Sequence, residues 1–266
     1  MMNRIALLAT AAVLALGTTA RAEDDDATYR QRWEDLRHAV FGDRKIEDGT
    51  GVITLDAPPR ALDAALVPVT IDLPGPQKIK AVYLTIDGNP SPLAGTFHFG
   101  PAADTHELKT RVRVDAYTLM HAVAETADGK LYVAERFIKA AGGCSAPGTM
   151  DAQLALDRLG QMKLKRAADA GGAAETVQLL ISHPNYNGMQ MDQLTRNYTP
   201  ARYIQDIKVT RGDALVFDFE SDISLSEDPA ITFGLAGKQQ TPLKVEVVDS
   251  TKAVFKRSFD IPGNGA

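Results

Sequence analysis

The sequence has little cysteine, few aromatic residues and no long apolar run beyond its first segment. One Cys and one Trp occur in 266 residues, and aromatic residues make up 6%. A single Cys excludes an internal disulfide framework. Acidic residues (34) outnumber basic ones (29), giving a formal net charge of -5, which provides no general attraction to nucleic acid or anionic lipid. Hydrophobic residues at 44% and charged residues at 24% predict an ordinary globular protein with a packed core.

Common catalytic and metal-binding motifs are also missing. The chain has no Gly-x-Ser-x-Gly elbow, P-loop or Gly-x-Gly-x-x-Gly fingerprint, so hydrolase and nucleotide-enzyme interpretations lack a starting residue. None of the five histidines stands in a ligand-spaced cluster with Cys, Asp or Glu, so we expect neither a metal site nor a cofactor. His121 lies in an apolar strand and His183 precedes Pro184; we expect structural roles for both.

The N-terminal segment has the pattern of a secretory signal. Met1–Ala22 carries an early basic residue, Arg4, then an apolar run, and closes with Ala20-Arg21-Ala22. The apolar run is shorter than the roughly 20 residues of a membrane span. We therefore predict cleavage after Ala22 and an exported, soluble mature protein. Removing the two arginines of this segment takes the net charge from -5 to about -7.

The hydrophobic periodicity predicts an all-β protein made of two immunoglobulin-like antiparallel sandwiches. A short amphipathic helix is expected over Asp26–Val40. Short β-rich runs separated by Gly, Pro and Asn-Pro turn signals then predict two series of strands. The first series is Val52–Leu55, Val67–Leu73, Ile79–Ile86, Thr96–Phe99, Glu107–Val114, Thr118–Glu125 and Leu131–Ile138, and the second is Val177–Ser182, Tyr203–Thr210, Ala214–Phe219, Ala230–Leu235, Leu243–Val248 and Val254–Phe259.

Between the two series the composition changes. Ala140–Gly148 has almost no side chain to bury and predicts an exposed, flexible segment. Apolar steps of three and four residues predict a connecting helix over Thr149–Ala168, ended by Gly171-Gly172. The expected organisation is a signal peptide over 1–22, a first sandwich with its N-terminal helix over 23–141, a cysteine-bearing arm and helix over 142–175, and a second sandwich over 176–266.

Cys144 is the residue that most needs an explanation, because the only cysteine of an exported protein has no internal partner. Most free cysteines are small buried hydrophobic residues, and that is the structural alternative. The flanking Gly142 and Gly143 favour a different interpretation, in which a thin backbone carries the thiol out from the sandwich and into a partner's active site. The immediate neighbours are uncharged, so no depression of the thiol pKa below about 8.5 is evident.

Several motifs resemble the sulfur-oxidation carrier family SoxYZ, with a SoxY-like part and a SoxZ-like part fused in one chain. The SoxY-like part covers about Trp33–Gly148 and the SoxZ-like part about Val177–Ile261. The first part carries Gly51-Val52-Ile53-Thr54-Leu55, Phe97-His98-Phe99-Gly100-Pro101, Thr110-Arg111-Val112-Arg113 and Gly142-Gly143-Cys144, and the second carries Ile181-Ser182-His183-Pro184, Gly188, Thr199-Pro200-Ala201-Arg202-Tyr203-Ile204-Gln205, Asp228-Pro229 and Phe233.

The resemblance implies a periplasmic carrier without a catalytic site of its own. Cys144 would hold sulfur intermediates covalently, as in thiosulfate oxidation, while a c-type cytochrome enzyme loads them and a hydrolase releases sulfate. The family's arm is a free C-terminus with Gly-Gly-Cys-Gly-Gly, whereas here Ser145-Ala146-Pro147 follows and the chain continues. This fused form is similar to SoxYZ-like carriers associated with quinoprotein alcohol dehydrogenases.

Three hypotheses therefore stand at this point. The first is the covalent carrier, and the second is a non-carrier accessory module that docks to a quinoprotein dehydrogenase or its cytochrome. The third is an enzyme that uses Cys144 as nucleophile, which lacks an identifiable base or oxyanion donor. The cargo, the oligomeric state and a Cys144 to Cys144 disulfide between two chains are left open by the sequence.

Overall fold

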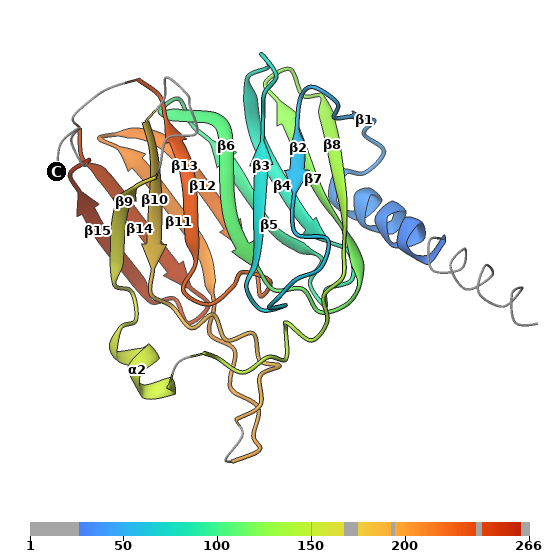
Figure 1. The fold of residues 1–266 in the computed structure, drawn as a ribbon. Helices are drawn as coiled ribbons and strands as arrows, with labels where there is room; N and C mark the ends of the chain where they lie inside the picture. Colours follow the sequence, from blue (N-terminus) through green and yellow to red (C-terminus); the bar gives the residue numbers. More distant parts are fainter. Residues whose placement is uncertain (1–26, 150, 168–174, 193–194, 238–240, 262–266) are drawn as a thin grey trace, which may run out of the picture. The chain divides into compact units, whose positions relative to one another are not determined.

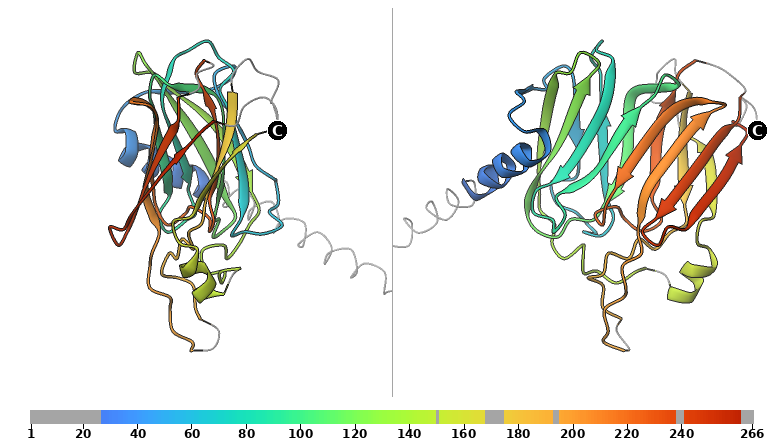
Figure 2. Two further views of the ribbon diagram at one scale, coloured as in Figure 1. Left: turned by 90° about the vertical axis from the view of Figure 1, so that its left-hand side faces the viewer. Right: turned by 180° about the vertical axis from the view of Figure 1, so that it is seen from behind.

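The fold is built of two β-sheets that face each other in two layers (Figures 1 and 2). The computed structural model describes residues 27–149, 151–167, 175–192, 195–237 and 241–261. The predicted signal segment lies outside these residues. A helix over residues 27–41 agrees with the predicted N-terminal helix and belongs to a separate unit from the sandwich, which begins at Arg44.

The all-β prediction is confirmed, and the core strands show the expected alternation. In Val67–Asp72 the hydrophobic residues Val67, Val69 and Ile71 are buried, whereas Pro68, Thr70 and Asp72 are more exposed, as period-two geometry requires. The strands are β1 (Ile46–Asp48), β2 (Thr54–Asp56), β3 (Val67–Asp72), β4 (Ile79–Ile86), β5 (Leu93–Phe99), β6 (Ala103–Val112), β7 (Thr118–Thr126), β8 (Leu131–Ile138), β9 (Met162–Arg166), β10 (Glu175–Ile181), β11 (Ile204–Arg211), β12 (Ala214–Ser221), β13 (Ala230–Leu235), β14 (Leu243–Asp249) and β15 (Val254–Phe259).

The two halves of the chain share both sheets. The nine-stranded sheet has the order β1-β8-β7-β4-β5-β12-β11-β14-β15, and the six-stranded sheet has the order β2-β3-β6-β13-β10-β9. Strand β5 pairs with β12 in one layer, and β6 pairs with β13 in the other, both antiparallel. The first sandwich therefore continues edge to edge into the second within one chain, as the right panel of Figure 2 shows for the larger sheet.

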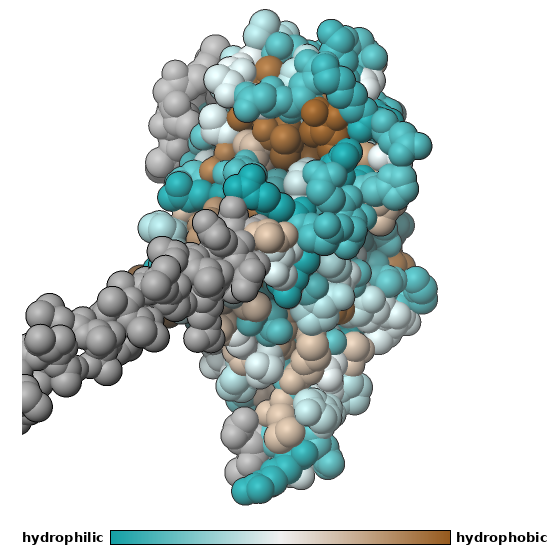
Figure 3. Space-filling view, turned by 90° about the vertical axis from the view of Figure 1, so that its right-hand side faces the viewer, coloured by the Kyte–Doolittle hydropathy of each residue, from teal (hydrophilic) through white to brown (hydrophobic). Residues whose placement is uncertain are grey.

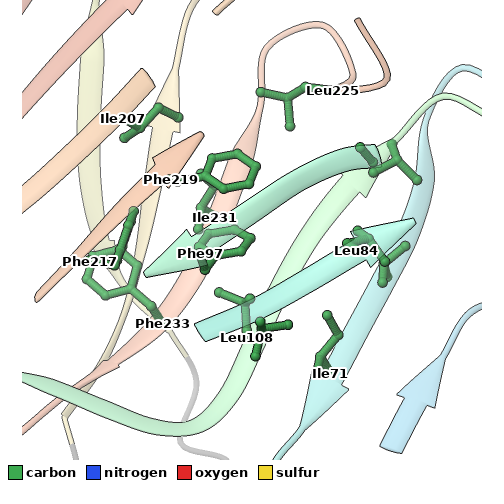
Figure 4. Close-up of a cluster of buried hydrophobic side chains, with 14 of the residues drawn as sticks. Ile71, Leu84, Phe97, Leu108, Ile207, Phe217, Phe219, Leu225, Ile231 and Phe233 are labelled. Atoms are coloured by element: carbon green, nitrogen blue, oxygen red, sulfur yellow. The ribbon is translucent and has the colours of Figure 1, made fainter. Parts of the chain in front are cut away.

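A group of phenylalanines fills the core where the halves meet (Figure 4). The rings of Phe97 on β5 and Phe219 on β12 stack with centroids 3.9 Å apart. Phe217 meets Phe97 edge to face at 5.6 Å and Phe233 at 4.9 Å. All four side chains are at most 2% exposed, so a single hydrophobic core runs through the join.

Two segments differ from the sequence-based prediction. The connecting helix predicted over Thr149–Ala168 is wrong beyond α2 (Ala152–Asp157), which Asp151 caps, because Met162–Arg166 forms edge strand β9 against β10. Apolar and basic residues alternate in Met162–Arg166, as in a strand with one buried face. Pairing with β10 therefore outweighs the three- and four-residue apolar spacing that predicts a helix. Strand β1 was not predicted; it pairs with β8 in parallel.

Figure 3 shows a face that is largely hydrophilic, with one group of hydrophobic residues gathered on its upper part. None of the described helices is long and apolar enough to cross a membrane.

We predict that the two halves unfold together. The substitution Phe97→Ala should lower the free energy of unfolding by about 3–5 kcal/mol, because it removes a fully buried ring from the shared core. Urea denaturation followed by circular dichroism measures this loss. Leu62→Ala, at a fully exposed side chain, should change it by less than about 0.5 kcal/mol. Two separated transitions in the wild-type protein would contradict a common core.

Candidate functional site

Cys144 lies in an irregular segment that follows β8 and leads toward α2 (Figure 1). The segment contacts Asn187, which lies in the loop between β10 and β11. The side chain of Cys144 is 0% exposed, and the thiol is free. The only cysteine of the chain is therefore packed into the protein.

The two glycines before Cys144 bring the segment close to neighbouring backbone. Gly142 N donates to Asp115 O (2.8 Å), and Gly143 N donates to Val114 O (3.0 Å). A Cβ on Gly143 would overlap the carbonyl group of Ala64 and lie 2.6 Å from Val114 O. Gly142 has a φ of 75°, a left-handed conformation that suits glycine. Docking of the segment therefore requires glycine at position 143 and favours it at position 142.

This arrangement corrects the expectation of an exposed arm over Ala140–Gly148. The scarcity of side chains predicts that the segment has little to bury, but in the structure it lets the segment's backbone approach other backbone and form hydrogen bonds. The expectation that Cys144 lies outside the core is also wrong, because the closely packed segment covers its thiol. The structure matches the alternative of a small buried residue in this conformation.

The second half of the chain completes the site. Asn187, in the loop between β10 and β11, donates from Nδ2 to the carbonyl oxygen of Cys144 (2.7 Å). Its own backbone N donates to Gln190 Oε1 (2.9 Å), and its Oδ1 accepts from Met189 N (2.9 Å). Asn187 is buried and held on three sides, so it fixes the cysteine from across the join.

Buried polar groups hold the start of that loop. His183 Nδ1 accepts from Asn185 N (3.0 Å), so the proton of the neutral ring is assigned to Nε2, 3.6 Å from Asp249 Oδ2. Asn185 Nδ2 donates to Ser226 O (2.6 Å). Burial lowers the pKa of His183 to about 4. The structural role predicted for His183 is confirmed, because its buried ring holds the backbone of this segment.

The thiol of Cys144 is kept protonated in this conformation. Burial, helped by the negative charge of Asp115, raises its pKa to about 12, although the positive charge of Arg113 acts in the opposite direction. Arg113 Nη1 donates to Gly143 O (3.3 Å). A buried, neutral thiol is neither a good nucleophile nor a metal ligand. Reaction at this sulfur therefore requires the segment to leave its place.

Sequence reasoning found Cys144, Gly142 and Gly143 but missed Arg113 and Asn187. Arg113 lies within the Thr110–Arg113 motif that resembles SoxY, and Asn187 directly precedes Gly188 of the SoxZ-like part, so both lie in or beside motifs of the family resemblance. Their function depends on spatial neighbours that the sequence does not reveal. The predicted structural role of His121 is confirmed: it is buried, and its Nδ1 lies 3.1 Å from Asp87 Oδ1.

Within the parts of the chain that the structure describes, no group of three or more His, Cys, Asp or Glu side chains could hold a metal ion.

Comparison with known proteins decides the family. The model of the sulfur oxidation protein SoxY matches residues 37–144, and the model of the sulphur oxidation protein SoxZ matches residues 162–260. The chain is a SoxY domain fused to a SoxZ domain. Among solved structures it is similar to the sulfur carrier protein SoxY from Chlorobium limicola f thiosulfatophilum, with 27% identity over 44% of this chain and 98% of that chain and a TM-score of 0.38. No curated protein matches the chain.

The SoxY match ends at Cys144, and Asn187 belongs to the SoxZ domain. The site is thus shared between the domains. The SoxY domain supplies the cysteine and Arg113, and the SoxZ domain supplies the amide that holds the cysteine's carbonyl. The SoxZ match also begins at β9, the strand that replaces the end of the predicted helix.

We predict that Gly143→Ala exposes the thiol, because the added methyl group overlaps the carbonyl group of Ala64 and prevents docking. Labelling of native protein by a thiol reagent at pH 8 should be slow for wild type and at least about tenfold faster for the variant, since one lost hydrogen bond and the steric clash together exceed 1.4 kcal/mol. Gly129→Ala, at a positive-φ turn with open space around it, is the control and should label like wild type. Equal labelling of all three proteins would show that the segment is not closed in solution.

We also predict a pH-dependent stability from His183. Its pKa falls from 6.5 in the unfolded chain to about 4 in the folded protein, so between these values the unfolded state binds a proton that the folded state does not. Stability should therefore be full above pH 6.5 and fall toward pH 4, by at most about 1.4 kcal/mol per pH unit. His183→Asn keeps an acceptor for Asn185 N but does not titrate. Urea midpoints between pH 7 and 4 should fall less steeply for this variant, and equal slopes would contradict the assignment.

Proposed function

We propose that this protein is a periplasmic carrier that holds sulfur-containing intermediates covalently on Cys144 and presents them to partner enzymes. One observation carries the proposal: the SoxY match ends at the chain's only cysteine, and a glycine-dependent segment docks that cysteine against both domains. Such a segment has a closed conformation that protects the sulfur. A partner that engages the segment has to release the hydrogen bonds of Gly142, Gly143 and Cys144 but not the pairing of the strands.

Among the described residues, four hydrogen bonds join Gly142, Gly143 and Cys144 to other parts of the structure. They are the bonds from Gly142 N and Gly143 N, the bond from Asn187 to Cys144 O, and the long bond from Arg113 to Gly143 O. Each contributes a net stabilisation of about 1 kcal/mol, so opening requires a few kcal/mol and does not require unfolding of the sheets. In the open segment the thiol pKa returns toward about 8.5 and the thiolate becomes available.

The proposed chemistry takes place with the segment open. An oxidising partner, of the c-type cytochrome class, joins Cys144 to thiosulfate with loss of one proton and two electrons, leaving an S–S–sulfonate on the cysteine. A hydrolase then adds water across the terminal S–S bond and releases sulfate. The carrier supplies the attachment point, and the partners supply the oxidant and the catalytic groups.

The surface around the segment supports docking of such partners. Loops and α2 at this end of the molecule expose large hydrophobic side chains, namely Leu62, Tyr117, Leu154 and Leu156. Leu62 lies two residues from Ala64, which contacts Gly143, and Tyr117 lies two residues from Asp115, which binds Gly142 N. Exposed apolar side chains close in sequence to the residues that hold the segment offer contacts for a partner protein.

The burial of Cys144 favours a second candidate, a non-carrier accessory module. In this alternative the cysteine is structural and the protein docks to a periplasmic quinoprotein alcohol dehydrogenase or its cytochrome. The two candidates differ in what happens to Cys144. Replacement of the thiol abolishes the function of a carrier, whereas an accessory module keeps its effect on the partner.

We predict that protein isolated from cells grown on reduced sulfur compounds carries an adduct on Cys144. Intact-protein mass spectrometry before and after reductant, with peptide mapping, should show a reductant-labile addition of sulfur or sulfonate mass. Cys144→Ser should show none, and Ser145→Ala should load like wild type. A wild-type protein with only free thiol, in cells that oxidise the sulfur compound, would favour the accessory module.

A further inference from the structure

Arg113 is a buried cation with unused hydrogen-bond donors. Its side chain is 0% exposed and is among the largest that the structure buries completely. Nη1 donates to Gly143 O at 3.3 Å, but Nε and Nη2 have no hydrogen-bond partner in the described structure. Burying a charge is costly unless it is paired and hydrogen bonded, and burial lowers the pKa of Arg113.

The groups around Arg113 do not complete its bonding. The negative charges of Glu227 and Asp63 favour its charged form from a distance, yet neither accepts a hydrogen bond from Nε or Nη2. The thiol of Cys144 is near enough for Arg113 to act on its pKa, but that pKa stays at about 12. The unloaded cysteine is therefore neutral and supplies no counter-charge.

We propose that the guanidinium of Arg113 binds the anionic end of a sulfur adduct on Cys144, such as a sulfonate or thiosulfonate. This inference rests on the proposed carrier function and adds a selectivity to it. A guanidinium presents several donors in one plane, which suits the oxygens of an oxyanion. Closing the loaded segment would give Nε and Nη2 the acceptors they lack, so an anionic cargo is held in the closed site more firmly than a neutral one.

Three carboxylates oppose this arrangement, because Asp115 acts on Cys144 and Glu227 and Asp63 act on Arg113. Asp115 and Glu227 are only half-buried and Asp63 is exposed, whereas Arg113 is fully buried. Charges that reach solvent are screened more strongly than buried ones. The buried cation therefore dominates the interaction with an anion placed at the sulfur.

The test compares an anionic and a neutral adduct on the same sulfur. In urea, the Cys144 thiolate attacks a central sulfur of tetrathionate, a new S–S bond forms, the central S–S bond breaks and thiosulfate leaves with the electron pair. The cysteine then carries –S–SO3⁻. Methyl methanethiosulfonate, with methanesulfinate as leaving group, gives the neutral –S–CH3 adduct. The protein with the anionic adduct and the protein with the neutral adduct are each refolded by dilution of the urea. Intact-protein mass spectrometry confirms one adduct per chain.

The rate at which dithiothreitol removes each adduct from native protein is then measured. In wild type, Arg113 should slow removal of the anionic adduct relative to removal of the neutral adduct. The ratio of the neutral to the anionic removal rate should therefore be on the order of tenfold higher in wild type than in Arg113→Gln, which is about the effect of one charge-assisted hydrogen bond. Asn187→Ala is the matched control, because it loosens the same segment without changing a charge and should accelerate both removals equally. An unchanged ratio in Arg113→Gln would overturn the proposal.

A second measurement does not depend on the folding of a variant. The urea midpoint of wild-type protein should be higher with the anionic adduct than with the neutral one, and equal or lower midpoints would count against Arg113 as the receptor. The adducts are installed in urea, so the removal rates and urea midpoints can be compared even if the protein carries no sulfur adduct in cells. Absence of an adduct in cells would overturn the carrier function, whereas an unchanged rate ratio would overturn only the role of Arg113.

Discussion

The structure depends on the pairing of β5 with β12, which joins two sandwiches into one pair of continuous sheets. Nine strands of one layer and six of the other follow from this join and from its counterpart between β6 and β13. Stacking of Phe97 on Phe219 makes the join part of the hydrophobic core. As a result the loop between β10 and β11 has a fixed position against the segment after β8, and an asparagine of the SoxZ domain reaches the cysteine of the SoxY domain.

The site controls its thiol by conformation. Many reactive cysteines have a lowered pKa from nearby positive charge, but here burial outweighs the positive charge of Arg113 and raises the pKa of Cys144 to about 12. The closed segment therefore protects the sulfur, and opening restores ordinary thiol chemistry. A carrier that moves between several enzymes benefits from such protection, since an exposed thiolate would exchange with other sulfur compounds.

In the site without an adduct, two donor groups of the buried Arg113 side chain have no hydrogen-bond partner among the described residues. Nearly all buried polar groups in native proteins have hydrogen-bond partners, so two unpartnered donors on a fully buried guanidinium need an explanation. An anionic adduct on the neighbouring sulfur provides one. In this interpretation the site is built for the loaded carrier, and the unloaded protein retains a destabilising charge for the sake of cargo recognition.

The sequence by itself determined the all-β class, most strand positions, the unpaired cysteine and the resemblance that the family matches confirm, because these depend on local periodicity and motifs. Only the tertiary structure decided that the two sandwiches share their sheets, that Met162–Arg166 is an edge strand, and that Cys144 is buried. The glycines beside Cys144 show why. A residue without a side chain permits either an extended arm or a close backbone contact, and the neighbouring backbone of Ala64 and Val114 determines which one forms.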